Sequence, residues 1–340
     1  MLQSGKIKQT FAHMSAFAVG ISLGLFATAG LCLAQSTVSM KVGHDSGTDF
    51  PYHDAAEWFK KEVEEKTEGR VSVQLFPNAQ LGDEAAMIDG LKIGSVDLVY
   101  TSIAPISELV PEVELFDMPF LLRDMDHALR VAKGDIGDSI KSKIEPATEA
   151  IVAGWGSLGT RDMWNSRQPI RTPEDLKGLK MRIQQSAVQR DTYTALGAQP
   201  TPISYGELYT SLQTGVVDGG DNGPLDVLAD KFYQVTKYLS LTHHFIVLNP
   251  ILVSKGFLEK VSPADREVIL EAAGKSGAVL TDSTKRRTDA AIAQLAELGL
   301  TIIEIDDSAR QKFIDAVRSV YDENADAIGG QELIEQALHQ

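Results

Sequence analysis

Four arginines lie close together in a chain that is otherwise rich in acids. Arg161, Arg167, Arg171 and Arg182 fall within 22 residues, whereas the whole sequence of 340 residues holds 47 Asp and Glu against 32 Lys and Arg. A guanidinium is planar and can pair with both oxygens of a carboxylate. The cluster therefore indicates a binding site for an organic anion. The alternative is a basic edge of the surface that faces only water.

Arg182 is the arginine best placed to reach a ligand. The run 179–184 is typical of a β-strand, and Arg182 stands between the apolar Met181 and Ile183. Strand alternation puts its side chain on the face opposite to theirs. Ser186 can cap the helix that follows, which fixes where the strand ends.

A polar, glycine-rich segment follows at 218–224, with the sequence DGGDNGP. Its glycines predict a backbone that a small molecule can approach closely. Asp221 offers an acceptor, and Asn222 offers both a donor and an acceptor. An ionised Asp221 beside a bound carboxylate would be repulsive unless it accepts ligand hydroxyls or holds a cation. Hydroxylated acids are therefore favoured.

Signals of catalysis or of a metal centre are weak. His44, His53, His243 and His244 lack zinc-type spacing, and no Gly-x-Ser-x-Gly elbow occurs. Cys32 is the only cysteine. We therefore expect no catalytic residue, no metal and no cofactor. Trp155 and Trp164 border the arginine cluster, and we expect them to form a wall of the cleft.

The first 34 residues resemble a secretory signal peptide. Lys6 and Lys8 precede an apolar run, and Cys32 and Ala34 stand at the −3 and −1 positions of a cleavage site after Ala34. An uncleaved membrane anchor is the alternative. A lipid anchor is rejected because the residues before Cys32 do not fit that signal. Cleavage would move the net charge from −15 to −17, which argues against nucleic acid and anionic lipid as partners.

The elements that carry these residues alternate between strand and helix. We predict strands at 38–44, 71–76, 96–100, 150–156, 179–184, 245–254 and 301–305, and helices at 52–67, 81–94, 125–133, 136–146, 263–298, 308–325 and 331–338. The early β-α-β-α-β order predicts parallel strands. No glycine-rich phosphate motif follows the first strand, so a nucleotide site is unsupported.

The chain is expected to form two α/β domains. The glycines of segment 154–159 indicate where it leaves the first domain, the strand at 245–254 is long enough to cross back, and the helix at 263–298 is long enough to span both. Residues 115–122 are strongly apolar and predict core.

The sequence resembles the solute-binding proteins of tripartite ATP-independent periplasmic (TRAP) transporters, of the DctP type. Four segments carry the resemblance in order: EKTEGRVSV with FPNAQLG (65–73, 76–82), LKIGSVD (91–97), NSRQPI with LKGLKMR (165–170, 176–182), and GAQPTP (197–202) through Asp218. The resemblance implies a two-domain periplasmic binding protein of type II-like fold, with hinge strands and a long domain-spanning helix. We expect domain I at 35–157 with a returning segment at about 246–285, and domain II at 158–245 with residues 286–340.

By resemblance, Arg182 is the arginine that binds the ligand carboxylate and Arg161 is a second arginine near it. Asn222 and Tyr205 match polar and aromatic positions of the pocket. Residues of the first domain would face the same cleft, and Gln184 beside Arg182 adds an amide. The full expected set is Arg182, Arg161, Asn222, Asp221, Tyr205, Gln184, Glu84, Ser102 and Asp45.

The resemblance implies a periplasmic protein that captures an organic acid and delivers it to membrane permease subunits without transforming it. Counting charges and hydrogen-bonding groups favours a sugar acid, such as a uronate or aldonate. The alternatives are a C4-dicarboxylate or another small carboxylate, and a sensor co-receptor that presents the ligand to a signalling protein. An enzyme is the rival class.

Overall fold

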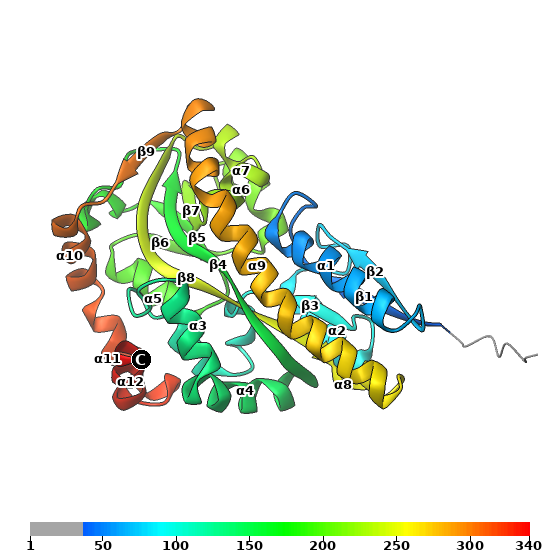
Figure 1. Ribbon diagram of the computed structural model, residues 1–340. Coiled ribbons are helices and arrows are strands. Elements are labelled where there is room, and N and C mark those ends of the chain that lie inside the picture. Colours follow the sequence, from blue (N-terminus) through cyan, green and yellow to red (C-terminus); the bar gives the residue numbers. More distant parts are fainter. Residues whose placement is uncertain (1–36) are drawn as a thin grey trace, which may run out of the picture. The chain divides into compact units, whose positions relative to one another are not determined.

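The computed structural model describes residues 37–340 (Figure 1). The predicted signal peptide, residues 1–34, lies outside the described residues. Within 37–340 no helix is both long and apolar enough to cross a membrane.

One sheet connects all the strands of the described chain. Its order is β2-β1-β3-β8-β4-β7-β5-β6, and β9 pairs with β8. The strands are β1 (Val38–Gly43), β2 (Val71–Phe76), β3 (Leu98–Tyr100), β4 (Ala150–Asn165), β5 (Lys180–Ile183), β6 (Gln199–Pro202), β7 (Gly219–Asn222), β8 (Tyr238–Ser254) and β9 (Thr301–Glu304). The predicted parallel pairs β1–β2 and β1–β3 are confirmed.

The two long strands β4 and β8 join two groups of shorter strands. They run antiparallel from Ala150↔Ser254 to Asn165↔Tyr238. β3 pairs with the end of β8, at Ile251 to Val253, whereas β7 pairs with the far end of β4, at Asp162 to Asn165. Each end of the β4–β8 ladder therefore belongs to a different part of the sheet, which is how two lobes share one pair of strands.

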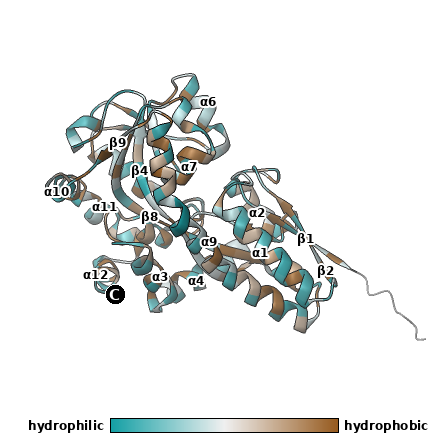
Figure 2. Ribbon diagram, turned by 45° about the horizontal axis from the view of Figure 1, so that its top comes forward, coloured by the Kyte–Doolittle hydropathy of each residue, from teal (hydrophilic) through white to brown (hydrophobic). Residues whose placement is uncertain are grey.

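Helices flank the sheet (Figure 1). The α-helices are α1 (Pro51–Lys66), α2 (Glu84–Ile93), α3 (Met125–Lys133), α4 (Asp135–Thr148), α5 (Ala187–Ala195), α6 (Leu208–Gln213), α7 (Pro224–Ala229), α8 (Lys255–Leu258), α9 (Pro263–Glu297), α10 (Asp307–Ala316), α11 (Arg318–Ile328) and α12 (Gln331–His339). Short 3-10 turns lie at Ala104–Ile106, Pro111–Asp117, Pro173–Leu176, Tyr205–Glu207 and Phe232–Gln234. The helices carry hydrophobic and hydrophilic residues on different faces (Figure 2), as amphipathic helices on a core do.

The helix α9 packs directly on β4 through glycines. A side chain at Gly277 would collide with the carbonyl oxygen of Trp155, and a Cβ at Gly154 would lie 2.7 Å from Cα of Gly274. The expectation that the chain leaves the first domain at 154–159 stays a prediction. β4 continues through that segment with irregular register, and Gly154 and Gly156 admit the backbone of the helix rather than forming a loop.

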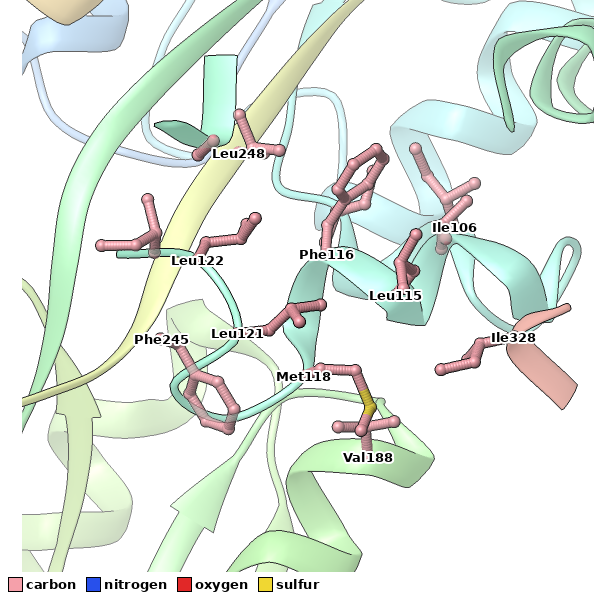
Figure 3. Packing of buried hydrophobic residues seen from close by; sticks show 14 of the residues in the cluster. Ile106, Leu115, Phe116, Met118, Leu121, Leu122, Val188, Phe245, Leu248 and Ile328 are labelled. Atoms are coloured by element: carbon pink, nitrogen blue, oxygen red, sulfur yellow. The ribbon is translucent and has the colours of Figure 1, made fainter. Parts of the chain in front are cut away.

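The apolar segment 115–122 lies in the core, as predicted. Leu115, Phe116 and Leu121 are buried, and Figure 3 shows them among residues from β8, α5 and α11. The tryptophans are also core, which corrects the expectation of a cleft wall. Trp164 stacks on Phe232 with ring centroids 5.1 Å apart, and Trp155 meets Phe116 edge to face at 5.7 Å.

Candidate functional site

Residues from both groups of strands line two adjoining cavities. The larger has a volume of about 210 Å³ and the smaller about 30 Å³, and Asp45, Glu84, Gln184 and Tyr205 line both. Arg182 lines the larger cavity, whereas Arg161, Ser102 and Asn222 line the smaller. Of the nine residues predicted for the site, only Asp221 lies outside this lining.

Arg182 has a guanidinium nitrogen that the protein leaves unpaired. The residue is buried in β5, and its Nε donates to the carbonyl oxygen of Ile203 at 2.8 Å. Its Nη1 is buried and finds no hydrogen-bond partner within residues 37–340. Burial, with the charge of Arg161, lowers the pKa of Arg182 to about 10, so the group is still charged at neutral pH. A buried, charged donor of this kind calls for an anion.

Arg161, in contrast, is already paired. Its Nε donates to Asp221 Oδ2 at 3.0 Å, its Nη2 to Asp221 Oδ1 at 2.9 Å and its Nη1 to Gln184 Oε1 at 2.9 Å. Burial lowers the pKa of Arg161, but the charge and hydrogen bonds of Asp221, together with the charge of Asp117, hold that pKa above its ordinary value. The net positive charge that Arg161 offers to a ligand is therefore small.

Asp221 acts on Arg161 and not on the cavity, which corrects its predicted role. Its side chain is fully buried, and both carboxylate oxygens accept hydrogen bonds from Arg161. Burial would raise the pKa of Asp221, but Arg161 holds it well below its usual range. The expected repulsion between Asp221 and a ligand carboxylate is thus cancelled within the protein.

The glycines beside Asp221 make room for β4 rather than for a ligand. A side chain at Gly219 would collide with the carbonyl oxygen of Trp164, and one at Gly220 would touch the ring of Trp164 at 3.0 Å. The segment forms strand β7, so Asp221 and Asn222 point to opposite faces. Asn222 reaches the smaller cavity, and its Oδ1 is buried without a partner in the described chain.

His244 is a buried neighbour of this group that sequence reasoning missed. Its Nε2 lies 3.1 Å from Asp221 Oδ2 and 3.3 Å from the hydroxyl of Tyr193. The neighbouring His243 is turned to Asp162 instead. His244 and Arg161 lie far apart in the sequence, and only the pairing of β4 with both β7 and β8 brings the two residues together. A local sequence pattern therefore does not predict that His244 lies beside Asp221.

Glu84, Ser102 and Gln184 form a hydrogen-bonded chain across the cavity. Glu84 begins α2, whose N-cap is Asp83, and its Oε2 accepts from Ser102 Oγ at 3.0 Å. Gln184 Nε2 donates to Ser102 Oγ at 2.9 Å. Because Gln184 also accepts from Arg161, this chain ties the wall formed near β3 to the wall formed by β5.

The remaining wall is acidic. Tyr205 places its hydroxyl 2.5 Å from Asp230 Oδ2 and 3.3 Å from Asp226 Oδ1, and its ring lies 5.9 Å from the guanidinium carbon of Arg182. Asp45 lines both cavities beside them. Asp226 and Asp230 were not predicted, although their i, i+4 spacing directly after the segment 218–224 could have suggested them.

Arg167 and Arg171 do not belong to the site. The side chain of Arg167 is 66% exposed and Arg171 is also exposed. The structure thus separates the four clustered arginines into a buried pair and an exposed pair. No group of three metal-ligating side chains occurs within the part of the chain that the structure describes.

Comparison with known proteins places the chain among binding proteins of one family. The family model of bacterial extracellular solute-binding proteins, family 7 (DctP), matches residues 42–327. The 2,3-diketo-L-gulonate-binding periplasmic protein YiaO of Escherichia coli K12 is 32% identical over 296 residues, which cover 87% of this chain and 88% of that protein.

Solved structures agree with the sequence comparison. A TRAP periplasmic solute-binding protein of Polaromonas sp. JS666, bound to D-erythronate, is 36% identical with a TM-score of 0.84, covering 88% of this chain and 98% of that one. One from Sulfurospirillum deleyianum, with bound succinate, is 28% identical with a TM-score of 0.85, covering 89% and 98%.

Proposed function

Because the chain belongs to the DctP family of bacterial extracellular solute-binding proteins, a family of binding proteins and not of enzymes, we propose that it captures a sugar acid for the membrane subunits of a TRAP transporter. The observation that carries the proposal is the buried, unpaired Nη1 of Arg182 beside an otherwise acidic cavity. A ligand carboxylate would pair with this nitrogen, and charge-assisted hydrogen bonds of this kind are among the strongest that proteins make.

The rest of the ligand would meet hydrogen-bond acceptors, namely carboxylate oxygens and the unpaired amide oxygen of Asn222. Asp45, Asp226 and Asn222 line the cavities with oxygen atoms, which suit hydroxyl groups because a hydroxyl can donate to each of them. The D-erythronate bound by the Polaromonas protein and the 2,3-diketo-L-gulonate of the Escherichia coli relative are acids of this class. We therefore favour a monocarboxylate with several hydroxyls, such as an aldonate or a uronate.

A C4-dicarboxylate is the second candidate, because the Sulfurospirillum protein was solved with succinate. The charges in this cavity disfavour it. Arg161 is neutralised by Asp221, so Arg182 alone would have to balance two carboxylates that face Asp45, Glu84 and Asp226. Buried polar groups left without partners cost about 1–3 kcal/mol each, so the acceptors of this wall should reject a ligand without donors.

A thermal-shift screen of organic acids tests the choice. A ligand at a hundred times its dissociation constant adds about 2.7 kcal/mol to stability, which shifts the melting temperature measurably. We expect stabilisation by some of glucuronate, galacturonate, galactonate and erythronate, and none by succinate, malate or fumarate. Stabilisation by the dicarboxylates alone would overturn the ligand class and leave the transport function standing.

The test for turnover is separate. After incubation with the most stabilising acid, mass spectrometry should recover that acid unchanged. A new product would contradict the assignment as a binding protein. A sensor co-receptor is distinguished in cells, since deletion of the gene would then abolish induction while uptake persists.

The family is periplasmic, and the cleavage of residues 1–34 is part of the proposal. Lys6 and Lys8 before an apolar run, and Ala34 at the expected cleavage position, support it. The intact mass of the protein recovered from the periplasm should correspond to residues 35–340. A mass that includes residues 1–34 would favour the uncleaved anchor instead.

A further inference from the structure

Among residues 37–340, the two adjoining cavities are lined by more carboxyl groups than the unpaired cation Arg182 can balance. Asp45, Glu84 and Asp226 line the smaller cavity, and Asp230 lies next to them through Tyr205. Against these four acids stands Arg182, because Arg161 is occupied by Asp221. A ligand that enters with its own carboxylate makes this imbalance larger. If all four acids stayed ionised, like charges would oppose both the burial and the ligand.

The geometry around Tyr205 is suited to holding a proton. A single hydroxyl contacts two carboxyl groups of α7 and its end, Asp230 Oδ2 at 2.5 Å and Asp226 Oδ1 at 3.3 Å. The hydroxyl has one hydrogen, so it can donate to only one of these carboxylates at a time. The other carboxylate oxygen is left beside an oxygen acceptor, and a proton on that carboxyl group relieves the contact.

The groups that face Asp226 from the neighbouring elements are mostly acidic or neutral. They are Asp230 and Tyr205, Asp45 from the loop after β1, Glu84 from α2, Tyr52 from α1 and Arg161 from β4. Arg182 from β5 lines the adjoining larger cavity. Burial and the charge of Asp230 raise the pKa of Asp226 to about 7, and Arg161 only partly opposes them. Burial, together with Glu84, also raises the pKa of Asp45 well above its usual range.

We propose that the protein takes up a proton together with its carboxylate ligand, and that Asp226, paired through Tyr205 with Asp230, receives it. This inference rests on the proposed function, because it needs an anion in the cavity. An anion beside Asp226 raises the pKa of that carboxyl further, so a site that is ionised when empty becomes protonated when filled. The protonated Asp226 can then donate a hydrogen bond to the ligand.

The sign of the pH dependence follows from the raised pKa. At a pH below the pKa of empty Asp226, the proton is already present and binding takes up none. At a pH above that pKa, the protein must take up a proton from solution when the ligand binds. Affinity then falls by about tenfold per pH unit for one proton taken up per ligand. Binding should therefore be nearly independent of pH below pH 6 and should weaken between pH 7 and pH 9.

Calorimetry in pairs of buffers with different ionisation enthalpies measures the proton count directly. The probe is D-glucuronate, with D-erythronate as a second acid; both are fully ionised at the pH values used. We expect about one proton taken up per ligand at pH 8 and close to none at pH 5.5. The same count must hold with EDTA present and with choline in place of Na⁺. Loss of binding without the metal ions would mean that a cation, not a proton, balances the charge, and would overturn the proposal.

Substitutions locate the proton. Asp226→Asn keeps the shape without the titrating group, so its proton count at pH 8 should fall to near zero and its affinity should no longer depend on pH. Asp230→Asn provides a second test of the pair and should lower the uptake as well. Glu207→Gln removes an exposed carboxylate at the mouth of the cavity and should retain the wild-type count.

The outcomes separate the two proposals. Binding without proton uptake at pH 8 overturns this inference and leaves the proposed function intact. Uptake that persists unchanged in both Asp226→Asn and Asp230→Asn overturns the assigned place of the proton. If none of the acids binds at any pH, the proposed function fails and this inference fails with it.

Discussion

Replacing Arg182 tests the site at the scale of one side chain. Arg182→Ala removes the unpaired buried donor, and loss of a charge-assisted pair of about 3 kcal/mol corresponds to at least about a hundredfold in affinity. Arg182→Lys should recover little, because an ammonium does not reproduce the planar fork. Calorimetry with the best acid of the screen measures both. Arg167→Ala, at a side chain 66% exposed, is the control, and an unchanged affinity in Arg182→Ala would remove Arg182 from the site.

Replacing Arg161 should instead lower stability. Arg161→Ala leaves Asp221 buried without its arginine partner, and removing one partner of a buried ion pair typically costs about 3–5 kcal/mol. The free energy of unfolding, measured with urea, should fall by that order. Adding Asp221→Asn to the same variant removes the unpaired charge and should restore part of the loss. A double variant no more stable than Arg161→Ala would contradict the pairing as the cause.

Arg182 and Arg161 differ in how well a local sequence pattern predicts their surroundings. Strand alternation placed Arg182 correctly, since it depends only on the neighbours Met181 and Ile183. The role of Asp221 depends on Arg161, which lies 60 residues away in sequence and meets it only because β4 pairs with β7. A local pattern carries no information on such a pairing, so the acid was assigned to the ligand.

The contact between α9 and β4 makes a prediction at the scale of elements. Gly277→Ala brings a methyl group against the carbonyl oxygen of Trp155, and such overpacking costs about 1–3 kcal/mol. Gly256→Ala in α8 is the matched control. Its nearest contact would be an ordinary 3.7 Å, and alanine favours a helix over glycine by about 1 kcal/mol, so stability should hold or rise. The melting temperatures of the two variants, measured by thermal unfolding, test this prediction. Equal stability of Gly277→Ala and Gly256→Ala would mean that α9 can move away from β4.

Most elements could be predicted from apolar periodicity and end signals, and the long strands show where this fails. Helix α5 begins after the capping Ser186 as expected, and α9 fills almost the whole predicted range. The strands β4 and β8 are longer than predicted because glycines and polar residues interrupt their patterns. Gly154 looks like a loop residue in the sequence, yet the backbone of a helix occupies the space of its missing side chain.

At the scale of the whole molecule, the two walls of the site belong to different lobes. Ser102 follows β3 and Gln184 follows β5, and the two side chains meet across the cavity at 2.9 Å. We predict that ligand binding closes the lobes, with domain I at 35–157 and about 246–285 and domain II in the remainder. Small-angle X-ray scattering should show a smaller radius of gyration with the ligand. Gln184→Ala should weaken this change, and an unchanged radius in the wild type would contradict closure.

The pairing of β8 also bears on the order in which the protein can fold. β3 is made early in synthesis, yet the strand at its side, Ile251 to Val253, follows about 150 residues later, and β4 waits for the same strand. Until β8 is made, β3 and β4 lack the strand that lies between them in the sheet. Pairings between such distant segments form slowly, because a long loop must close first. The sheet therefore cannot be completed until most of the chain has been made, so its two groups of strands are joined only late in synthesis.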